Sequence, residues 1–158
     1  MSNEEMVIAS ALGAWSGNLE RAGKLFAGVS AEELQKQVAP GKNRLIYLWG
    51  HLAAVNDRMV ELLGLGERTH PEFDAVFLSS PDGAAEMPPP EELQGWWTEV
   101  NKKLSDGFAT LSPGGWLQKH NAVSEEDFAQ NPLRNRLAVL LSRTNHLSYH
   151  LGQIVLAS

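Results

Sequence analysis

Apolar side chains recur at steps of three and four along the chain, which is the spacing of one buried face of an α-helix. In the first such stretch these positions are Ile8, Leu12, Trp15, Leu19, Ala22 and Phe26. In the second, expected from about Asn43 to Leu63, they are Leu48, Leu52, Val55, Met59 and Leu62. Gly64 and Gly66 follow and are expected to end this second helix.

Two further stretches have the same helical period. The third follows the prolines at 88–90, and its apolar positions are Leu93, Trp97, Val100, Leu104 and Leu111. The fourth is expected to begin near Asn131 and Pro132, because asparagine caps helices and proline is tolerated in the first turn. Its apolar positions are Leu133, Leu137, Leu140, Leu147, Leu151 and Ile154. No stretch alternates at period two, so the sequence predicts an all-α protein with four long helices.

The connections between these helices suggest how they are arranged. Residues 65–89 are too many for a tight antiparallel turn, and such a segment can carry the chain along the full length of a bundle. The second and third helices would then run parallel. In the first connection, Ser30 and Glu33 have the spacing of a capping box for a short helical turn.

Composition narrows the class of protein. A chain of 158 residues fits a single domain spanning 1–158. Its net charge of −6 argues against binding to nucleic acids or anionic membranes. No apolar run approaches the roughly 20 residues of a membrane span, and residues 1–10 lack the basic start of a signal peptide. We therefore expect a cytoplasmic protein with no membrane or nucleic-acid partner.

Three of the five histidines have a spacing that suits a metal site. His146 and His150 are four residues apart, so on a helix they project to the same side, although such a pair also arises by coincidence. His51 lies in the second predicted helix, about 14 Å from that helix's start, and the pair lies at a similar depth from the chain's end. If the second and fourth helices are antiparallel, the three imidazoles are level and can share one ion.

Two segments carry a family resemblance. "NRLIYLWGHLAAVNDRMVELLGLGERTHPEFDAVF" and, far downstream, "NHLSYHLGQI" resemble the DinB-like (damage-inducible) family of four-helix bundles. The resemblance implies an up-down-down-up bundle with a long crossover between the second and third helices. It also implies a homodimer and a metal triad of His51, His146 and His150. The implied ion is divalent, zinc or nickel, and some relatives transfer low-molecular-weight thiols.

Several polar residues are candidates for a role near this ion. Gln153 is one turn beyond His150 and is a candidate to orient it, while Asn145 and Tyr149 border the pair. Arg58, two turns from His51, is a candidate to meet an anionic substrate. Asn56 and Asp57 are expected on a solvated face.

The donor set leaves the chemistry open. Nitrogen-only ligands also suit iron or manganese, and three imidazoles leave coordination positions for a substrate. The sequence contains no cysteine, so any thiol must arrive with the substrate. One hypothesis is a metal-dependent thiol transferase or hydrolase that activates water or a substrate thiol. The alternative is a non-catalytic metal-binding or stress-associated bundle protein.

Overall fold

The computed structural model describes residues 1–157, and these residues form seven α-helices and two short 3-10 helices with no β-strand. The prediction of an all-α protein is therefore confirmed. None of the helices within this range combines the length and the apolarity needed to cross a lipid bilayer.

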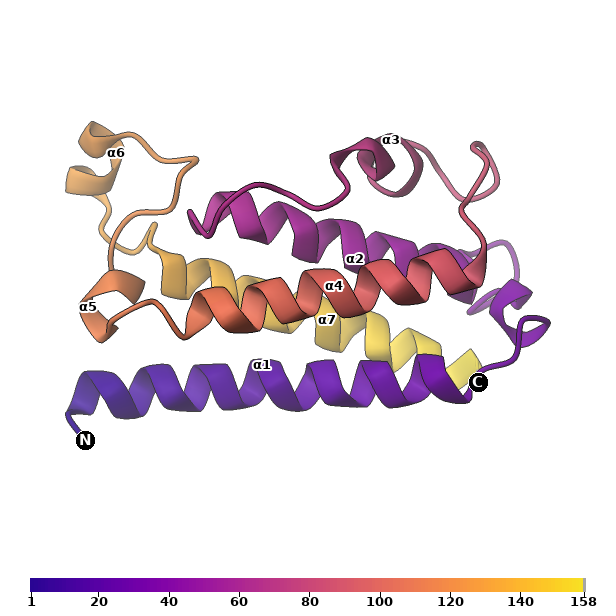
Figure 1. The fold of residues 1–158 in the computed structure, drawn as a ribbon, viewed down its shortest axis with the longest axis horizontal. Helices are drawn as coiled ribbons and strands as arrows, with labels where there is room; N and C mark the ends of the chain where they lie inside the picture. Colours follow the sequence, from indigo (N-terminus) through magenta and orange to yellow (C-terminus); the bar gives the residue numbers. More distant parts are fainter. Residues whose placement is uncertain (158) are drawn as a thin grey trace.

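Four long helices lie side by side (Figure 1). They are α1 (Asn3–Gly28), α2 (Leu45–Leu62), α4 (Pro90–Phe108) and α7 (Arg136–Ala157). α1 and α7 run in one direction, and α2 and α4 run in the other. α1 packs mainly against α7, and α2 packs against both α4 and α7. As a result, α2 and α7 are antiparallel neighbours.

Short helical pieces occupy the connections. Between α1 and α2 lies η1 (Glu33–Gln35), preceded by the expected capping box, in which the Glu33 amide donates to Ser30 Oγ over 3.2 Å. The crossover from α2 to α4 contains η2 (Pro71–Phe73) and α3 (Asp74–Phe77). The connection from α4 to α7 contains α5 (Pro113–Trp116) and α6 (Glu125–Gln130).

α2 is the central helix, since 14 of its 18 residues are buried. The expectation that Asn56 and Asp57 face solvent is wrong, because α4 and the crossover cover them. Asn56 donates to the Asn101 side chain over 2.8 Å, and Asp57 accepts from the Thr69 amide over 2.7 Å and from Arg68 Nε over 3.1 Å. Asp57 thus fixes the start of the crossover to α2.

Two helix boundaries differ from the prediction. α7 begins at Arg136, and Leu133, expected in its buried stripe, is 75% exposed ahead of the helix. The cap is Asn135, whose Oδ1 accepts from the Ala138 amide over 2.9 Å. At the other boundary α4 ends at Phe108, so Leu111 lies beyond the helix in which it was expected. In both cases the apolar spacing extends beyond the helix itself, before the start of α7 and after the end of α4, so spacing alone placed the boundary wrongly.

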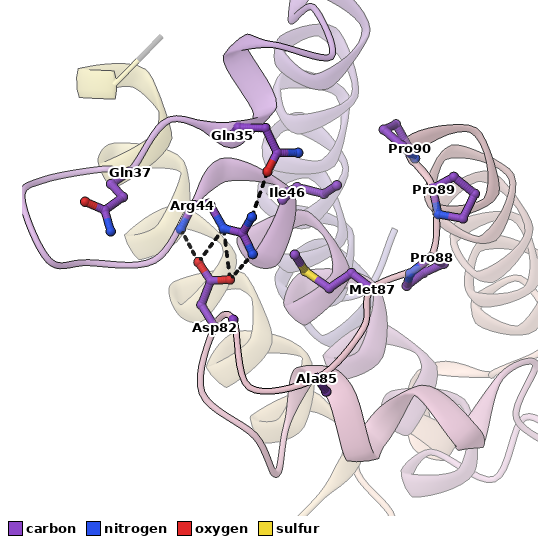
Figure 2. Close-up of a pocket in the computed structure, with 11 residues that line it drawn as sticks. Gln35, Gln37, Arg44, Ile46, Asp82, Ala85, Met87, Pro88, Pro89 and Pro90 are labelled. Atoms are coloured by element: carbon purple, nitrogen blue, oxygen red, sulfur yellow. Dashed lines mark hydrogen bonds and ion pairs between the residues drawn. The ribbon is translucent and has the colours of Figure 1, made fainter.

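The far end of the crossover is held by an ion pair at the start of α2 (Figure 2). Asp82 accepts from the Arg44 amide over 2.8 Å and from Arg44 Nη2 over 2.7 Å, while Arg44 Nη1 donates to Gln35. These residues line an open cavity of about 710 Å³ that includes none of the histidines. Because its charged groups already satisfy each other, we assign this region to anchoring the crossover.

Candidate metal centre

Three histidines meet where α2 faces α7. His51 lies on α2, and His146 and His150 lie one turn apart on α7. The two helices are antiparallel (Figure 1), and the short distances between the ring nitrogens show that the three positions are level. All three side chains are half-buried, and one nitrogen of each lies within 4.8 Å of the others. The structure therefore brings together the residues that the sequence singled out, here called the three-histidine cluster.

The spacing of the nitrogens suits a shared ion. His146 Nε2 lies 3.1 Å from His51 Nε2 and 3.2 Å from His150 Nε2. Two imidazole nitrogens bound to one zinc ion at about 2.0–2.1 Å are separated by roughly 3–3.4 Å. The three-histidine cluster could therefore hold a metal ion with little movement of its side chains.

Hydrogen bonds on the far side of two rings decide which nitrogens carry protons. His51 Nδ1 lies 2.9 Å from the Phe77 carbonyl oxygen, and His150 Nδ1 lies 2.7 Å from Gln153 Oε1. Since both partners are acceptors, each Nδ1 donates and each Nε2 keeps a free lone pair. His146 can donate its single Nε2 proton to one of these lone pairs only. Hydrogen bonding within the cluster is thus incomplete, and a cation would satisfy all three nitrogens.

The cluster is neutral at pH 7. Burial is the largest cause that lowers the pKa of His146 to about 4, and His150 and His51, when protonated, and the charge of Arg143 lower it further. Burial also lowers the pKa values of His51 and His150, although their hydrogen bonds to Phe77 and Gln153 oppose this shift. Neutral imidazole is the form that binds metals. The surroundings of the three histidines therefore disfavour their protonation and keep them in the form that binds a metal ion.

A glycine next to His51 lets the crossover approach α2. A Cβ atom on Gly50 would lie only 2.2 Å from the ring of Phe77. The close approach places the Phe77 carbonyl over His51, and Tyr47 holds the same segment by donating to the Ser80 carbonyl over 2.7 Å. Phe77 was not among the candidates from the sequence. A glycine within a helix is a signal of close packing, but it does not say which residue approaches.

Comparison with known proteins agrees with this arrangement. The family model of the DinB superfamily matches residues 14–154, a range that includes the whole three-histidine cluster. The chain belongs to the DinB superfamily. No curated protein matches the chain. Membership of the DinB superfamily and the geometry of the cluster are both compatible with a metal-binding site.

The other candidates in this DinB-superfamily chain have different surroundings. Gln153 contacts the cluster directly, as an acceptor for His150. Tyr149 is 65% exposed, and its hydroxyl accepts a 3.4 Å hydrogen bond from Gln153 Nε2. Asn145 is exposed on α7, and among residues 1–157 no hydrogen bond joins it to the histidines. Of the three, Gln153 is the one positioned to orient a ligand.

Arg58 is already paired. Its Nε donates to Asp74 over 2.9 Å, and Asp74 also accepts two hydrogen bonds from Arg68. A different arginine, Arg143, lies three residues before His146 on α7 and was not a candidate from the sequence. The sequence could not have predicted a role for Arg143, because whether an arginine forms an ion pair depends on residues that are distant in the chain.

Proposed function

We propose that His51, His146 and His150 hold one divalent metal ion in a catalytic centre. The proposal rests on one observation, the convergence of three Nε2 atoms of which at least two present lone pairs. Zinc or nickel is our first choice, and an all-imidazole site is also compatible with iron or manganese. An ion there supplies a Lewis acid that lowers the pKa of a water or a thiol.

The reaction we propose is the transfer of a small thiol or a hydrolysis. Because the chain has no cysteine, the thiol of a transferase reaction comes with the substrate. The protein's own part is to hold the imidazoles neutral and oriented. Gln153 and the Phe77 carbonyl do this for His150 and His51 by fixing the proton on Nδ1.

A non-catalytic metal-binding role is the alternative, and the number of ligands argues against it. Structural zinc sites are usually closed by four protein ligands, whereas catalytic sites keep a position for substrate. Within residues 1–157, the group of potential ligands at this site contains three histidines and no carboxylate. The ligand set therefore supports a centre that is open to a small molecule.

The proposal includes the architecture around the site. We infer that residues 1–158 form one domain, an up-down-down-up four-helix bundle with its long crossover between α2 and α4. The directions of the helices in Figure 1 support this assignment. In such a bundle the cluster lies between two antiparallel helices, and α3 of the crossover supplies the Phe77 carbonyl that holds His51.

Elemental analysis of protein purified without an affinity tag tests the metal centre. We expect about one divalent ion per chain in the natural protein and none in a variant with all three histidines changed to alanine. Circular dichroism checks that the variant keeps its helices. His120→Ala, a histidine outside the cluster, serves as the matched control and should keep its metal. Equal metal content in the triple variant and the natural protein would refute the proposal.

An activity screen tests the catalytic part. Small electrophiles would be incubated with and without added thiols, and ester and amide substrates would be tested separately. Protein stripped of metal by a chelator is the blank, and activity should return when zinc or nickel is restored. Turnover that is unchanged by complete removal of metal would refute a metal-dependent mechanism.

A further inference from the structure

One arginine beside the three-histidine cluster has no hydrogen-bond or ion-pair partner among residues 1–157. Arg143 is half-buried, and its Nε is inaccessible to solvent and makes no hydrogen bond. The other half-buried arginines among residues 1–157 are each bonded: Arg44 to Asp82, Arg68 to Asp57 and Asp74, and Arg136 to the Gly115 carbonyl. A half-buried guanidinium group whose Nε is buried without a hydrogen-bond partner carries a desolvation cost, so a functional reason is expected.

Arg143 lines a cavity of about 390 Å³, here called the arginine pocket. Its other lining residues come from the end of α2, from the crossover and from the connection before α6, and they are Arg58, Glu61, Leu62, Arg68, Asn121 and Ala122. Three guanidinium groups therefore surround a space that includes one carboxylate, the exposed Glu61. In a chain with a net charge of −6, this is a local concentration of positive charge.

Of the three arginines that line the arginine pocket, Arg143 is the one whose positive charge is not balanced by a carboxylate among the described residues. Arg58 and Arg68 are compensated by ion pairs with Asp74, and Arg68 also pairs with the buried Asp57. No carboxylate among the described residues pairs with Arg143. Burial, and then the charge of Arg58, lower the pKa of Arg143, as expected for a cation that has no anion beside it.

The arginine pocket and the three-histidine cluster lie along the same face of α7, although none of the three histidines lines the pocket. Arg143 precedes His146 by three residues and His150 by seven, so the three side chains share one face of α7. The charge of Arg143 reaches the cluster, because it contributes to lowering the pKa values of His51 and His146. A small molecule that spans the arginine pocket and the cluster would contact Arg143 at one end and the histidines at the other.

We propose that Arg143 binds a carboxylate group of the substrate, so that the site acts on small carboxylate-bearing molecules. This inference rests on the proposed function and specifies its substrate class. A guanidinium group matches a carboxylate with two parallel hydrogen bonds. One surplus positive charge, with Glu61 at the edge of the pocket, fits a monoanion better than a phosphate dianion. Arg143 is then a substrate-binding residue that fixes the reacting end of the molecule at the cluster.

The first test is a titration with acetate followed by the NMR signal of the Arg143 Nε–H group, identified by its loss in Arg143→Gln. We expect acetate to shift this signal with saturation and neutral acetamide to leave it in place. Arg21→Gln, on the exposed side of α1, removes the same charge elsewhere and should not change the titration. No response to acetate would overturn the inference, and tighter binding of inorganic phosphate would overturn the choice of a carboxylate.

The second test uses probes that reach both ends of the site. Calorimetry on zinc-loaded protein would compare 3-mercaptopropionate with 2-mercaptoethanol, which lacks the carboxylate. We expect a preference of roughly 10- to 100-fold for 3-mercaptopropionate, the size of a charge-assisted pair. Arg143→Gln should lose the preference while keeping its zinc and its affinity for 2-mercaptoethanol, and Arg143→Lys should recover part of it.

The two proposals fail in different ways. A protein that binds no metal would refute the proposed metal centre, and the acetate titration would still decide the role of Arg143 because its readout needs no ion. A zinc-loaded protein that binds the two thiols equally would overturn the role of Arg143 alone.

Discussion

At the scale of single residues, Gln153 holds one ligand of the proposed centre in place. Its Oε1 accepts from His150 Nδ1 over 2.7 Å, which leaves Nε2 free to bind an ion. Loss of such a supporting partner commonly weakens metal binding by about 10- to 100-fold. We therefore predict that Gln153→Ala keeps its fold but binds zinc more weakly by about this factor, as measured by competition with a chromophoric chelator.

Tyr149→Phe is the matched control for Gln153. The Tyr149 hydroxyl contacts Gln153 Nε2 at 3.4 Å, not a histidine, so its removal should change the zinc affinity less than threefold (roughly one weak hydrogen bond). Equal losses in the two variants would show that Gln153 has no special role.

The residues of the cluster also predict how the metal-free protein responds to acid. The pKa of His146 falls to about 4 on folding, from an ordinary value of 6.5. Well above pH 6.5 neither state is protonated, so His146 does not affect the free energy of unfolding. Between 6.5 and 4 the unfolded chain takes up a proton that the folded chain does not, so the free energy of unfolding decreases as the pH falls.

Urea unfolding of chelator-treated protein at pH 7 and pH 5 measures this effect. We predict a loss of about 1 kcal/mol from His146 after allowing for solvent screening, and more when His51 and His150 contribute. The variant His146→Asn, which cannot titrate in this range, should lose less than the natural protein. Identical losses in both would contradict the assignment.

At the scale of elements, the approach of α3 to α2 depends on Gly50. Alanine there would place its methyl group 2.2 Å from the Phe77 ring, so the ring and the carbonyl that holds His51 must move. We predict that Gly50→Ala lowers the free energy of unfolding by about 1–3 kcal/mol and weakens zinc binding. Thermal unfolding and zinc titration measure the two effects.

Gly95→Ala on α4 is the control for Gly50. Apart from the local backbone of α4, no atom lies within 4 Å of the added methyl group. Because alanine also favours helix, this variant should gain about 0.5–1 kcal/mol in the free energy of unfolding and bind zinc as before. A stabilised Gly50→Ala protein would show that the crossover adapts without strain.

The four long helices differ in how well the sequence pattern predicts which of their residues are buried. Helical spacing was sufficient to locate α1, and α4 as far as its end at Phe108, because each has one apolar face and one polar face. It was not sufficient for α2, where α4 and the crossover bury Asn56 and Asp57 among the apolar residues. The histidines of the cluster could be predicted from the sequence, because two of them are four residues apart and the third lies at a similar distance along an antiparallel helix. Phe77 and Arg143 were not, because their roles arise from contacts between distant segments.

At the scale of the whole molecule, we predict that the protein is a homodimer. The prediction rests on the family resemblance alone. Tryptophans are common in interfaces, but all five in this chain are at most 7% exposed within one protomer. Light scattering after size exclusion should give twice the chain mass of 17.3 kDa across the micromolar range. A mass of 17.3 kDa throughout that range would show the protein to be a monomer.

The distance along the chain between His51 and His146 has a kinetic consequence. These residues are 95 positions apart, so bringing their imidazoles together closes a long loop, and we expect this contact to form late, when α7 docks on α2. Contacts that form this late are largely absent from the folding transition state. An ion bound by them should therefore stabilise the native protein without accelerating its folding, and should act almost entirely on the unfolding rate.

Stopped-flow measurements with and without zinc test this expectation. With free zinc at about 100 times its dissociation constant, unfolding should slow by roughly 100-fold while the refolding rate stays nearly constant. Faster refolding in zinc would mean that the ion joins α2 and α7 before the rest of the chain is in place. If refolding is unaffected, the ion binds only after the native structure has formed, and it sets the lifetime of the folded protein through the unfolding rate.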